Sequence, residues 1–193
     1  MPAKPKYAAK AHMTDTVGQP TLLGSEGEEA EADIMRIPLA IDSMCGPTTP
    51  ISKALQWRGW RVHSWDLRLD ASHDLSKAKG QEDVMQDVPM VDFCMSAMAF
   101  STLTRARNKP IPNHPKPPQP LRSDDYPMGL PEAIDCPTHD QHTRALPANG
   151  LVQFLCRVAS VVDANGGFNL LEHLARAYMW MLEVVKELAS QQG

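Results

Sequence analysis

The sequence predicts an α/β fold: a Rossmann-like, mostly parallel sheet of about four strands flanked by helices. Two observations support this prediction. Apolar segments end at Asp42, Asp66 and Glu172, as buried parallel strands do where their carboxyl ends open toward a ligand. Segments with apolar residues at helical spacing separate and follow these strands. The 193 residues can form one domain with a hydrophobic core, which we place at residues 35–189.

Residues 1–34 are predicted to form a disordered acidic tail. They combine proline, glycine and small residues with the acidic run SEGEEAEAD. They contain too few apolar groups to offset the entropy cost of ordering the backbone. The net charge of −4 for the whole chain is too small to predict a partner by itself.

Cysteine spacing and apolar content indicate the compartment. The four cysteines lie far apart, without a CxxC pair, which argues against a disulfide scaffold or a zinc ribbon. No apolar run approaches the ~20 residues that cross a bilayer, and the N-terminus has lysines but no apolar signal segment. We therefore expect an intracellular protein, nuclear or cytoplasmic, with no membrane association.

The opening unit is predicted as a strand ending at Asp42, a helix, and a second strand ending at Asp66. Thr49 fits the N-cap of this helix, Pro50 its first position and Gly59 the residue just past its end. In a parallel sheet the two carboxylates lie at the same edge, outside which ligands bind. The spacing therefore predicts a ligand cleft without identifying the ligand.

The later elements are predicted from their apolar patterns. Residues 66–89 are polar and uneven, and can hold one short helix at most. After them we expect a third strand within residues 90–100 that ends near Ala97, a helix at 147–163, a fourth strand at 168–172 and a second amphipathic helix at 174–188.

A proline-rich basic loop, residues 108–131, separates the third strand from the helix that follows. Eight prolines between Pro110 and Pro131 exclude a helix interior or a central strand. The stretch from Arg105 to Arg122 contains basic residues and no acid. Because this loop leaves the carboxyl end of a strand, it should face the cleft, and we expect it to contact nucleic-acid phosphates.

Five motifs, in this order along the chain, resemble a known family. The turn after the first strand reads GPTTPISKA from Gly46, the second strand ends in an acid, and HDL follows from His73. A Ser-Thr-x-x-Arg-Ala-Arg segment follows the third strand at 101–107, and the fourth strand ends in Glu172. Over roughly residues 38–188 the chain resembles the first half of an S-adenosylmethionine-dependent cytosine-5 DNA methyltransferase. It is more similar still to short methyltransferase-like proteins whose turn reads Gly-Pro-x-x-Pro-x-Ser-Lys-Ala.

The resemblance implies a cofactor, S-adenosylmethionine, and positions for it. Asp42 and Gly46 would border its methionine and ribose, where a glycine lets backbone approach the ligand. Asp66 would accept the ribose hydroxyls, and Asp74 would lie near the adenine amino group. Glu172 would hold the cytosine ring.

Glu172, Arg105 and Arg107 are the candidate catalytic residues that the resemblance implies. The nucleophilic cysteine of the family attacks C6 of a flipped cytosine, but Phe100 stands at the matching position. The implied function is a methyltransferase-like domain that binds S-adenosylmethionine and acts on DNA cytosine while lacking this cysteine. The alternative is a catalytically inactive Rossmann-like binding or interaction module.

Other residues could substitute in the chemistry. Direct methyl transfer to an amine or hydroxyl needs no covalent nucleophile, and Glu172 or His173 would then be the candidate general base. Cys94 is predicted to be buried within the third strand. Cys45 lies in the presumed cofactor turn, where it could be reactive, but on the methyl-donor side and not beside the base.

The sequence allows three further interpretations. Cys136, His139 and His142 could ligate a metal, but they lack an evident fourth ligand, so no metal site is predicted. A dinucleotide is disfavoured because Thr48 stands where the second glycine of GxGxxG would lie. An exposed strand edge after the Glu172 strand would favour pairing with another copy of the chain.

Overall fold

The computed structural model describes residues 36–98, 102–109, 111–113, 119–134 and 142–191. The predicted acidic tail and Phe100 lie outside these residues, and of Arg107 only the backbone is described.

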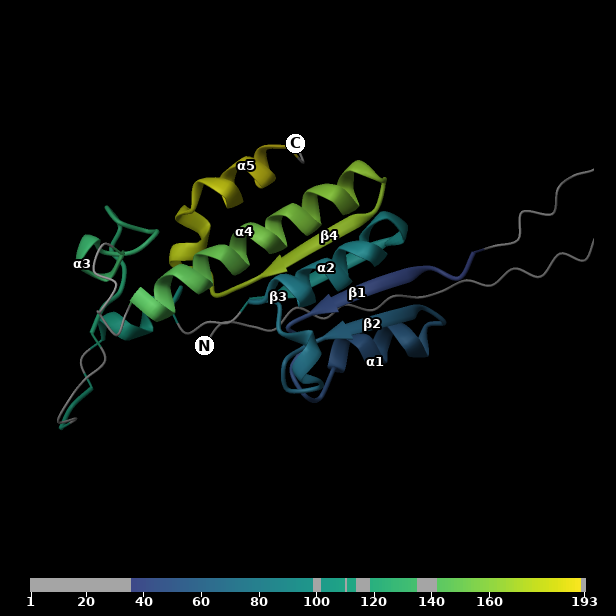
Figure 1. Cartoon of the computed structure of the whole chain (residues 1–193), viewed down its shortest axis with the longest axis horizontal. Helices are drawn as coiled ribbons and strands as arrows, with labels where there is room; N and C mark the ends of the chain where they lie inside the picture. The colour runs from purple at the N-terminus through teal and green to yellow at the C-terminus, as the bar shows by residue number, and fades with distance from the viewer. Residues whose placement is uncertain (1–35, 99–101, 110, 114–118, 135–141, 192–193) are drawn as a thin grey trace, which may run out of the picture. The chain divides into compact units, whose positions relative to one another are not determined.

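A four-stranded, all-parallel sheet in the order β2-β1-β3-β4 organises the domain (Figure 1), which confirms the predicted α/β, Rossmann-like class. The strands are β1 (Leu39–Ser43), β2 (Arg61–Trp65), β3 (Phe93–Ala97) and β4 (Phe168–Glu172). The α-helices are α1 (Pro50–Trp57), α2 (Ala78–Asp87), α3 (Pro131–Ile134), α4 (His142–Ala164) and α5 (Glu183–Gln191). Short 3-10 turns are η1 (Ala71–His73), η2 (Val88–Met90), η3 (Arg105–Asn108) and η4 (Tyr178–Met181).

The two faces of the sheet carry different helices. On one face α1 packs against β1 and β2, where the Ser52 N–H donates to Asp42. On the other face lies α2, where Oδ2 of Asp87 is 2.6 Å from Nδ1 of His63 on β2. The same face holds α4, which contacts β3 and β4. Because α1 covers only β1 and β2, helices lie on both faces over only part of the width of the sheet.

The hydrophobic core lies between the sheet and α4. Leu39 and Ile41 of β1, with Leu155, Val158 and Val162 of α4, are fully buried. Among the described residues α4 is the one helix long and apolar enough to cross a membrane by length and composition, but half of that stretch is buried in this core. Its apolar character is thus explained by its place in the fold.

An apolar part of the α1 face is open to solvent. Phe168 and Leu170 alternate along β4 on this face, with exposed fractions of 76% and 48%. Phe93 and Met95 of β3 pair with them in register. No helix of the described part of the chain packs over these four side chains in the way that α1 covers β1 and β2.

The predicted opening unit is confirmed closely. The helix begins at Pro50, and Gly59 lies just past its end with φ of +85°. This left-handed conformation allows the Gly59 N–H to donate to the carbonyl of Gln56 at 2.9 Å. The first strand ends one residue beyond Asp42, and the second ends immediately before Asp66.

The predicted capping role of Thr49 is wrong. Thr49 occupies the N-cap position in a left-handed conformation, with φ of 45°, and its side chain makes no capping hydrogen bond. The Asp42 carboxylate accepts the first-turn N–H of Ser52 instead, at 3.0 Å. The cap therefore comes from the preceding strand, and a local sequence pattern does not reveal it.

The sequence predicts one short helix at most between β2 and β3. The structure has α2 there, together with the 3-10 turns η1 and η2. Gly80 lies in the first turns of α2, and a Cβ there would come within 2.5 Å of the Asp74 carbonyl oxygen. β3 is also shorter than predicted, because η2 extends to Met90 and the strand starts at Phe93.

The two C-terminal helices have different boundaries from those predicted. α4 begins at His142 and continues through Pro147, its sixth residue, although a proline inside a helix removes one intrahelical hydrogen bond. The last helix is confined to α5. The residues before it turn through η4, where the Tyr178 N–H donates to the Leu103 carbonyl at 2.8 Å. Leu174 is half exposed, so its helical spacing does not reflect packing.

Candidate functional site

A cavity of about 640 Å³ opens at the carboxyl ends of the strands. Residues that end or follow all four strands line it, together with the segment after β2 and with Leu151 of α4. Its volume is ordinary for a small-molecule site. Among the predicted site residues, Gly46, Asp66, Asp74 and Glu172 line the cavity. The sheet topology thus brings together residues that are up to 126 positions apart in the sequence.

Asp66 joins the turn after β1 to the segment after β2. Its Oδ2 accepts the Gly46 N–H at 2.9 Å, and its Oδ1 accepts the Arg68 N–H at 2.8 Å. Gly46 has φ of +70°, a conformation that side chains other than glycine rarely adopt. The glycine at this position therefore lets the backbone turn its N–H toward the carboxylate.

Trp65 and His73 form an aromatic wall of the same cavity. Their rings lie 4.6 Å apart between centroids, at 46° to one another. Both residues line the cavity, and Trp65 Nε1 and His73 Nδ1 are buried atoms without a hydrogen-bond partner in the described part of the protein. Buried polar nitrogens are usually paired, so these two are exceptions in the wall of the cavity.

Asp74 holds the end of η1 and also borders the cavity. Its Oδ1 accepts the N–H of Ser76 at 3.0 Å and the Ser76 hydroxyl at 2.6 Å. The hydroxyl bond, together with the backbone bond and nearby Lys77, lowers the pKa of Asp74. The group is therefore an anionic acceptor at neutral pH.

Glu172 closes the β4 end of the cavity. It pairs in register with Ala97 at the end of β3, and both residues line the cavity. His173 does not line it. Burial lowers the pKa of His173, and the charge of Glu172 opposes that shift. The Leu174 N–H donates to Nδ1 of His173 at 2.9 Å. Of the two candidate bases, Glu172 is therefore the one at the cavity.

Asp42 differs from its expected role, because it does not line the cavity. The residue is 1% exposed and its Oδ2 accepts the Ser52 hydroxyl at 2.6 Å as well as the Ser52 N–H. Ser64 of β2 donates its hydroxyl to Ser52 Oγ at 2.7 Å. Asp42 thus anchors α1 to the sheet and does not line the cavity.

The burial of Asp42 has a measurable pH signature. Desolvation raises its pKa from 3.8, against the effect of the Ser52 hydrogen bonds. A carboxyl whose folded-state pKa is raised contributes stability below its unfolded pKa and loses it as the pH rises through the folded value. We therefore expect the free energy of unfolding of the native protein, minus that of Asp42→Asn, to fall as the pH rises from 3.8 toward neutrality.

Urea denaturation of both proteins at several pH values measures this difference. Asp70→Asn is the control of opposite sign, because hydrogen bonds from Ser72 lower the pKa of Asp70. The corresponding difference for Asp70 should rise with pH. A difference for Asp42 that stays constant or rises would contradict the proposed cost of its buried charge.

No described thiol is placed for nucleophilic chemistry. Burial raises the pKa of Cys45, Cys94 and Cys156 to about 11 each, and the charges of Asp42 and Asp66 add to the effect at Cys45. None of the three lines the cavity. Cys94 is buried in β3 as predicted, and the anticipated reactivity of Cys45 is not supported.

Alkylation should report this directly. Because the thiolate is the reacting species, a rise of the Cys45 pKa from 9.0 to about 11 should slow its reaction with iodoacetamide at pH 7.5 by roughly 100-fold relative to a thiol with the lower pKa. Mass spectrometry of the Cys45 peptide measures the rate, with the urea-unfolded chain as the control. Equal rates in the folded and unfolded chain would refute the assignment.

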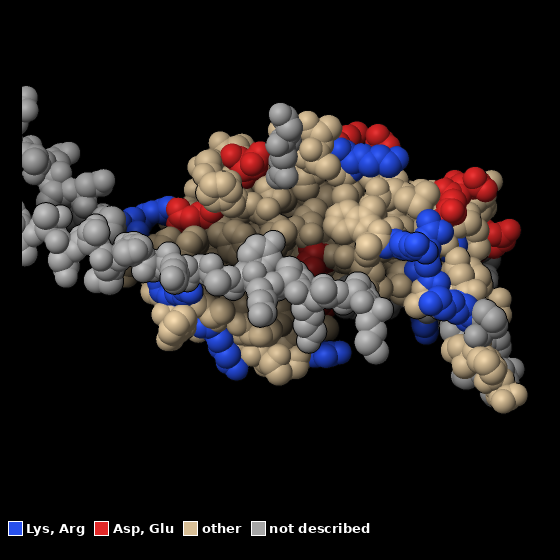
Figure 2. Space-filling view, turned by 180° about the vertical axis from the view of Figure 1, so that it is seen from behind, with Lys and Arg blue, Asp and Glu red and all other residues tan. Residues whose placement is uncertain are grey.

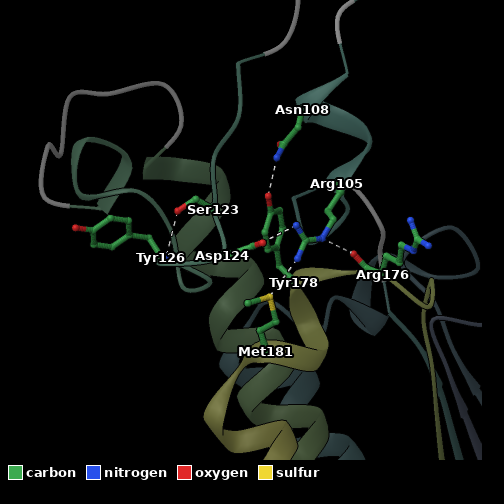
Figure 3. A network of polar contacts seen from close by, with 8 residues as sticks. All are labelled: Arg105, Asn108, Ser123, Asp124, Tyr126, Arg176, Tyr178 and Met181. Carbon is green, nitrogen blue, oxygen red and sulfur yellow. Dashed lines mark hydrogen bonds and ion pairs between the residues drawn. The ribbon is translucent and has the colours of Figure 1, made fainter.

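Arg105 lies in a network outside the cavity (Figure 3). Its guanidinium stacks over the Tyr178 ring, 4.6 Å from the centroid. Nε donates to the Arg176 carbonyl at 2.9 Å, and Nη1 forms an ion pair with Asp124. Asn108 donates to the Tyr178 hydroxyl at 2.6 Å. Arg105 therefore ties η3 to the segment after β4 and does not line the cavity.

Arg122, counted in the sequence among the charges of the basic loop, is 1% exposed. Its Nε donates to the Thr102 carbonyl at 2.9 Å, and Nη1 donates to the Pro127 carbonyl at 2.6 Å and to Asn149 Oδ1 at 2.8 Å. Burial lowers its pKa to about 10. Arg122 is therefore a structural clamp and cannot contact phosphate.

The remaining charges give mixed support for nucleic-acid contact. On the face shown in Figure 2, small groups of Lys and Arg side chains lie beside Asp and Glu side chains. Lys109 is exposed, whereas Lys116 and the side chain of Arg107 lie outside the described residues. The contribution of the basic loop to a partner thus stays a prediction.

Within the described ranges, no group of three or more His, Cys, Asp or Glu residues is arranged to hold a metal ion. Cys136, His139 and the side chain of His142 lie outside those ranges, so the structure does not test that constellation.

Sequence reasoning missed Trp65, His73 and Leu151 as cavity residues. Trp65 immediately precedes the acid of β2 and His73 immediately precedes Asp74, so adjacency to predicted site residues was the signal that could have identified them. Leu151 offers no such signal, because its helical spacing indicates only a packed face. Comparison with protein-family models, with curated proteins and with solved structures finds no match to this chain.

Proposed function

We propose that this domain is methyltransferase-like and binds S-adenosylmethionine in the cavity at the carboxyl ends of its strands. One observation carries the proposal: Gly46, Asp66 and Asp74 line one cavity. These are residues that the resemblance to cytosine-5 methyltransferases assigns to the methionine, ribose and adenine parts of the cofactor. Because Asp42 does not line the cavity, the proposal depends on these three residues.

The polar groups of the cavity suit a nucleoside. Each Asp66 oxygen accepts one backbone N–H, and because a carboxylate oxygen can accept two hydrogen bonds, acceptors remain for two ribose hydroxyls. The rings of Trp65 and His73 add an aromatic surface to the cavity. Such a surface favours a planar base.

The chemistry best supported at this cavity is direct transfer. Bound S-adenosylmethionine supplies an electrophilic methyl group, and the chain must then orient an acceptor toward it. No described thiol lines the cavity, and Phe100 replaces the cysteine of the family. Glu172 lines the cavity and would accept the proton of an amine or hydroxyl acceptor. Covalent activation of cytosine is accordingly the less favoured route.

Ligand titration tests the proposal. Purified protein is titrated with S-adenosylmethionine, with its demethylated product and with a nicotinamide dinucleotide, while tryptophan fluorescence and heat are followed. We expect saturable binding of the first two alone. Trp65→Phe should remove most of the fluorescence change while calorimetry still detects binding, because Trp65 lines the cavity.

Trp57→Phe is the matched control, since Trp57 is 81% exposed and lies outside the cavity lining. This variant should keep the fluorescence response. If the folded protein binds neither methyl-donor compound, the proposal fails and the inactive binding or interaction module replaces it. Preferential binding of the dinucleotide would also overturn it.

A further inference from the structure

The segment of α1 and the start of β2 carries a group of exposed cations. Lys53, Arg58 and Arg61 are exposed, and none of the ion pairs within the described ranges involves them. Residues 43–65 contain these three basic residues and neither Asp nor Glu. Along the lower edge of the molecule in Figure 2, on the side where Figure 1 shows α1, Lys and Arg side chains lie without Asp or Glu among them. This surface is therefore positive, although the whole chain has a net charge of −4.

Trp57 lies among these cations and is 81% exposed. It is the last residue of α1. Lys53 lies about one helical turn before it, so the two side chains are neighbours on the helix surface. The guanidinium carbon of Arg58 is 5.3 Å from the centroid of the Trp57 ring, which is within the range of a cation–π contact. One solvent-exposed indole is thus flanked by two cations.

The turn between α1 and β2 holds this group in a fixed geometry. The N–H groups of Arg58 and Trp60 donate to the Leu55 carbonyl at 2.9 and 3.1 Å. The Trp60 ring packs edge-on against Phe93 of β3, with 6.4 Å between the ring centroids. Because the backbone of the turn is already ordered by these contacts, binding at this surface costs little backbone entropy.

The combination of an exposed indole and free cations favours single-stranded nucleic acid over other anionic partners. An unpaired base stacks on an aromatic side chain while its neighbouring phosphates contact Lys and Arg. The carboxylates of an acidic protein segment would use the cations alone and leave the indole in water. Anionic membranes are recognised by clusters of about four to eight basic residues, more than the three present here.

We infer that Trp57 and the three cations form a binding site for single-stranded nucleic acid on the α1 side of the domain. Trp57 stacks on a base, and the cations contact phosphates without reading the sequence. The site is separate from the proline-rich basic loop. None of its four residues lines the cavity, so this inference goes beyond the cofactor proposal and does not depend on it.

A fluorescein-labelled oligothymidylate of about twelve nucleotides tests the inference by fluorescence anisotropy with the full chain. Saturable binding is expected. With three phosphate contacts, the logarithm of the binding constant should fall with the logarithm of the salt concentration with a slope of about −2. Trp57→Ala should weaken binding about tenfold without changing this slope. Trp57→Phe keeps an aromatic ring and should recover most of the affinity.

Charge variants separate the phosphate contacts from stacking. The double variant Arg58→Gln, Arg61→Gln keeps one of the three contacts, so its salt slope should be about −0.7. Arg157→Gln on α4 and Lys109→Gln in the basic loop are the matched controls, because both residues are exposed and lie in other segments. Both should keep a slope of about −2. Thermal midpoints confirm that every variant folds.

Four results would overturn the inference. The first is that the native chain shows no saturable binding. The second is that Lys109→Gln lowers the salt slope while the Arg58 and Arg61 double variant does not, because the basic loop would then be the contact. The third is that vesicles containing phosphatidylserine bind through Trp57 and the oligonucleotide does not. The fourth is that a peptide with the sequence SEGEEAEAD of residues 25–33 binds at Trp57 and the oligonucleotide does not displace it.

Discussion

Replacing Asp66 with asparagine is expected to weaken binding of S-adenosylmethionine about 100-fold. The carboxylate would lose two charge-assisted hydrogen bonds to ribose, each contributing about 1.5 kcal/mol or more. In the native protein Asp66 accepts the N–H groups of Gly46 and Arg68. The amide nitrogen of asparagine would face one of these N–H groups, so that two donors would oppose each other. Isothermal titration calorimetry measures the affinity directly.

Asp70→Asn is the matched control for this prediction. Asp70 lies in the same segment and accepts the Ser72 N–H at 2.8 Å in a similar local turn, but it does not line the cavity. Its replacement should change affinity by less than about twofold. If Asp66→Asn binds as tightly as the Asp70 variant, the ribose is not held at Asp66 and the proposed orientation of the cofactor is wrong.

Replacing Arg122 with methionine is expected to lower the free energy of unfolding by about 3–5 kcal/mol. The guanidinium donates to three segments: Thr102 after β3, Pro127 in the loop, and Ala145 and Asn149 in α4. Without it, several buried carbonyl groups lose their donor, and each such loss costs about 1–3 kcal/mol, not fully additively. Urea denaturation provides the measurement.

Arg157→Met controls for the loss of an arginine as such. Arg157 is exposed on α4, so its replacement should change stability by no more than about 0.5 kcal/mol. Arg122→Lys should lie between the two, because an ammonium cannot reproduce the planar fork of donors. A loss below about 1 kcal/mol for Arg122→Met would show that the loop is held by other contacts.

The sequence was sufficient for the sheet and for much of the cavity. Strand ends at Asp66 and Glu172 and the helix stop at Gly59 depend on local chemistry, so residue spacing identified them. Once parallel strands are recognised, their carboxyl ends must meet at one edge. That rule alone brings Gly46, Asp66 and Glu172 to one cavity.

The features that the sequence did not reveal depend on contacts between distant segments. Asp42 was assigned to the ligand because it ends a strand, but its carboxylate accepts the N–H of Ser52 and caps the helix whose cap the local pattern assigned to Thr49. Arg122 was counted as a surface charge because its acceptors are backbone carbonyls, which have no sequence signature. Arg105 likewise bonds to segments more than 70 residues away.

The unequal covering of the sheet also affects how folding of this protein would be assayed. With Phe168 and Leu170 open beside β3, the native domain offers an apolar surface to dyes such as anilinonaphthalene sulfonate. Strong dye fluorescence is normally taken as a mark of a molten globule. Here it should accompany an intact near-ultraviolet circular dichroism spectrum, so dye emission alone would misreport a well-packed protein as a loosened one.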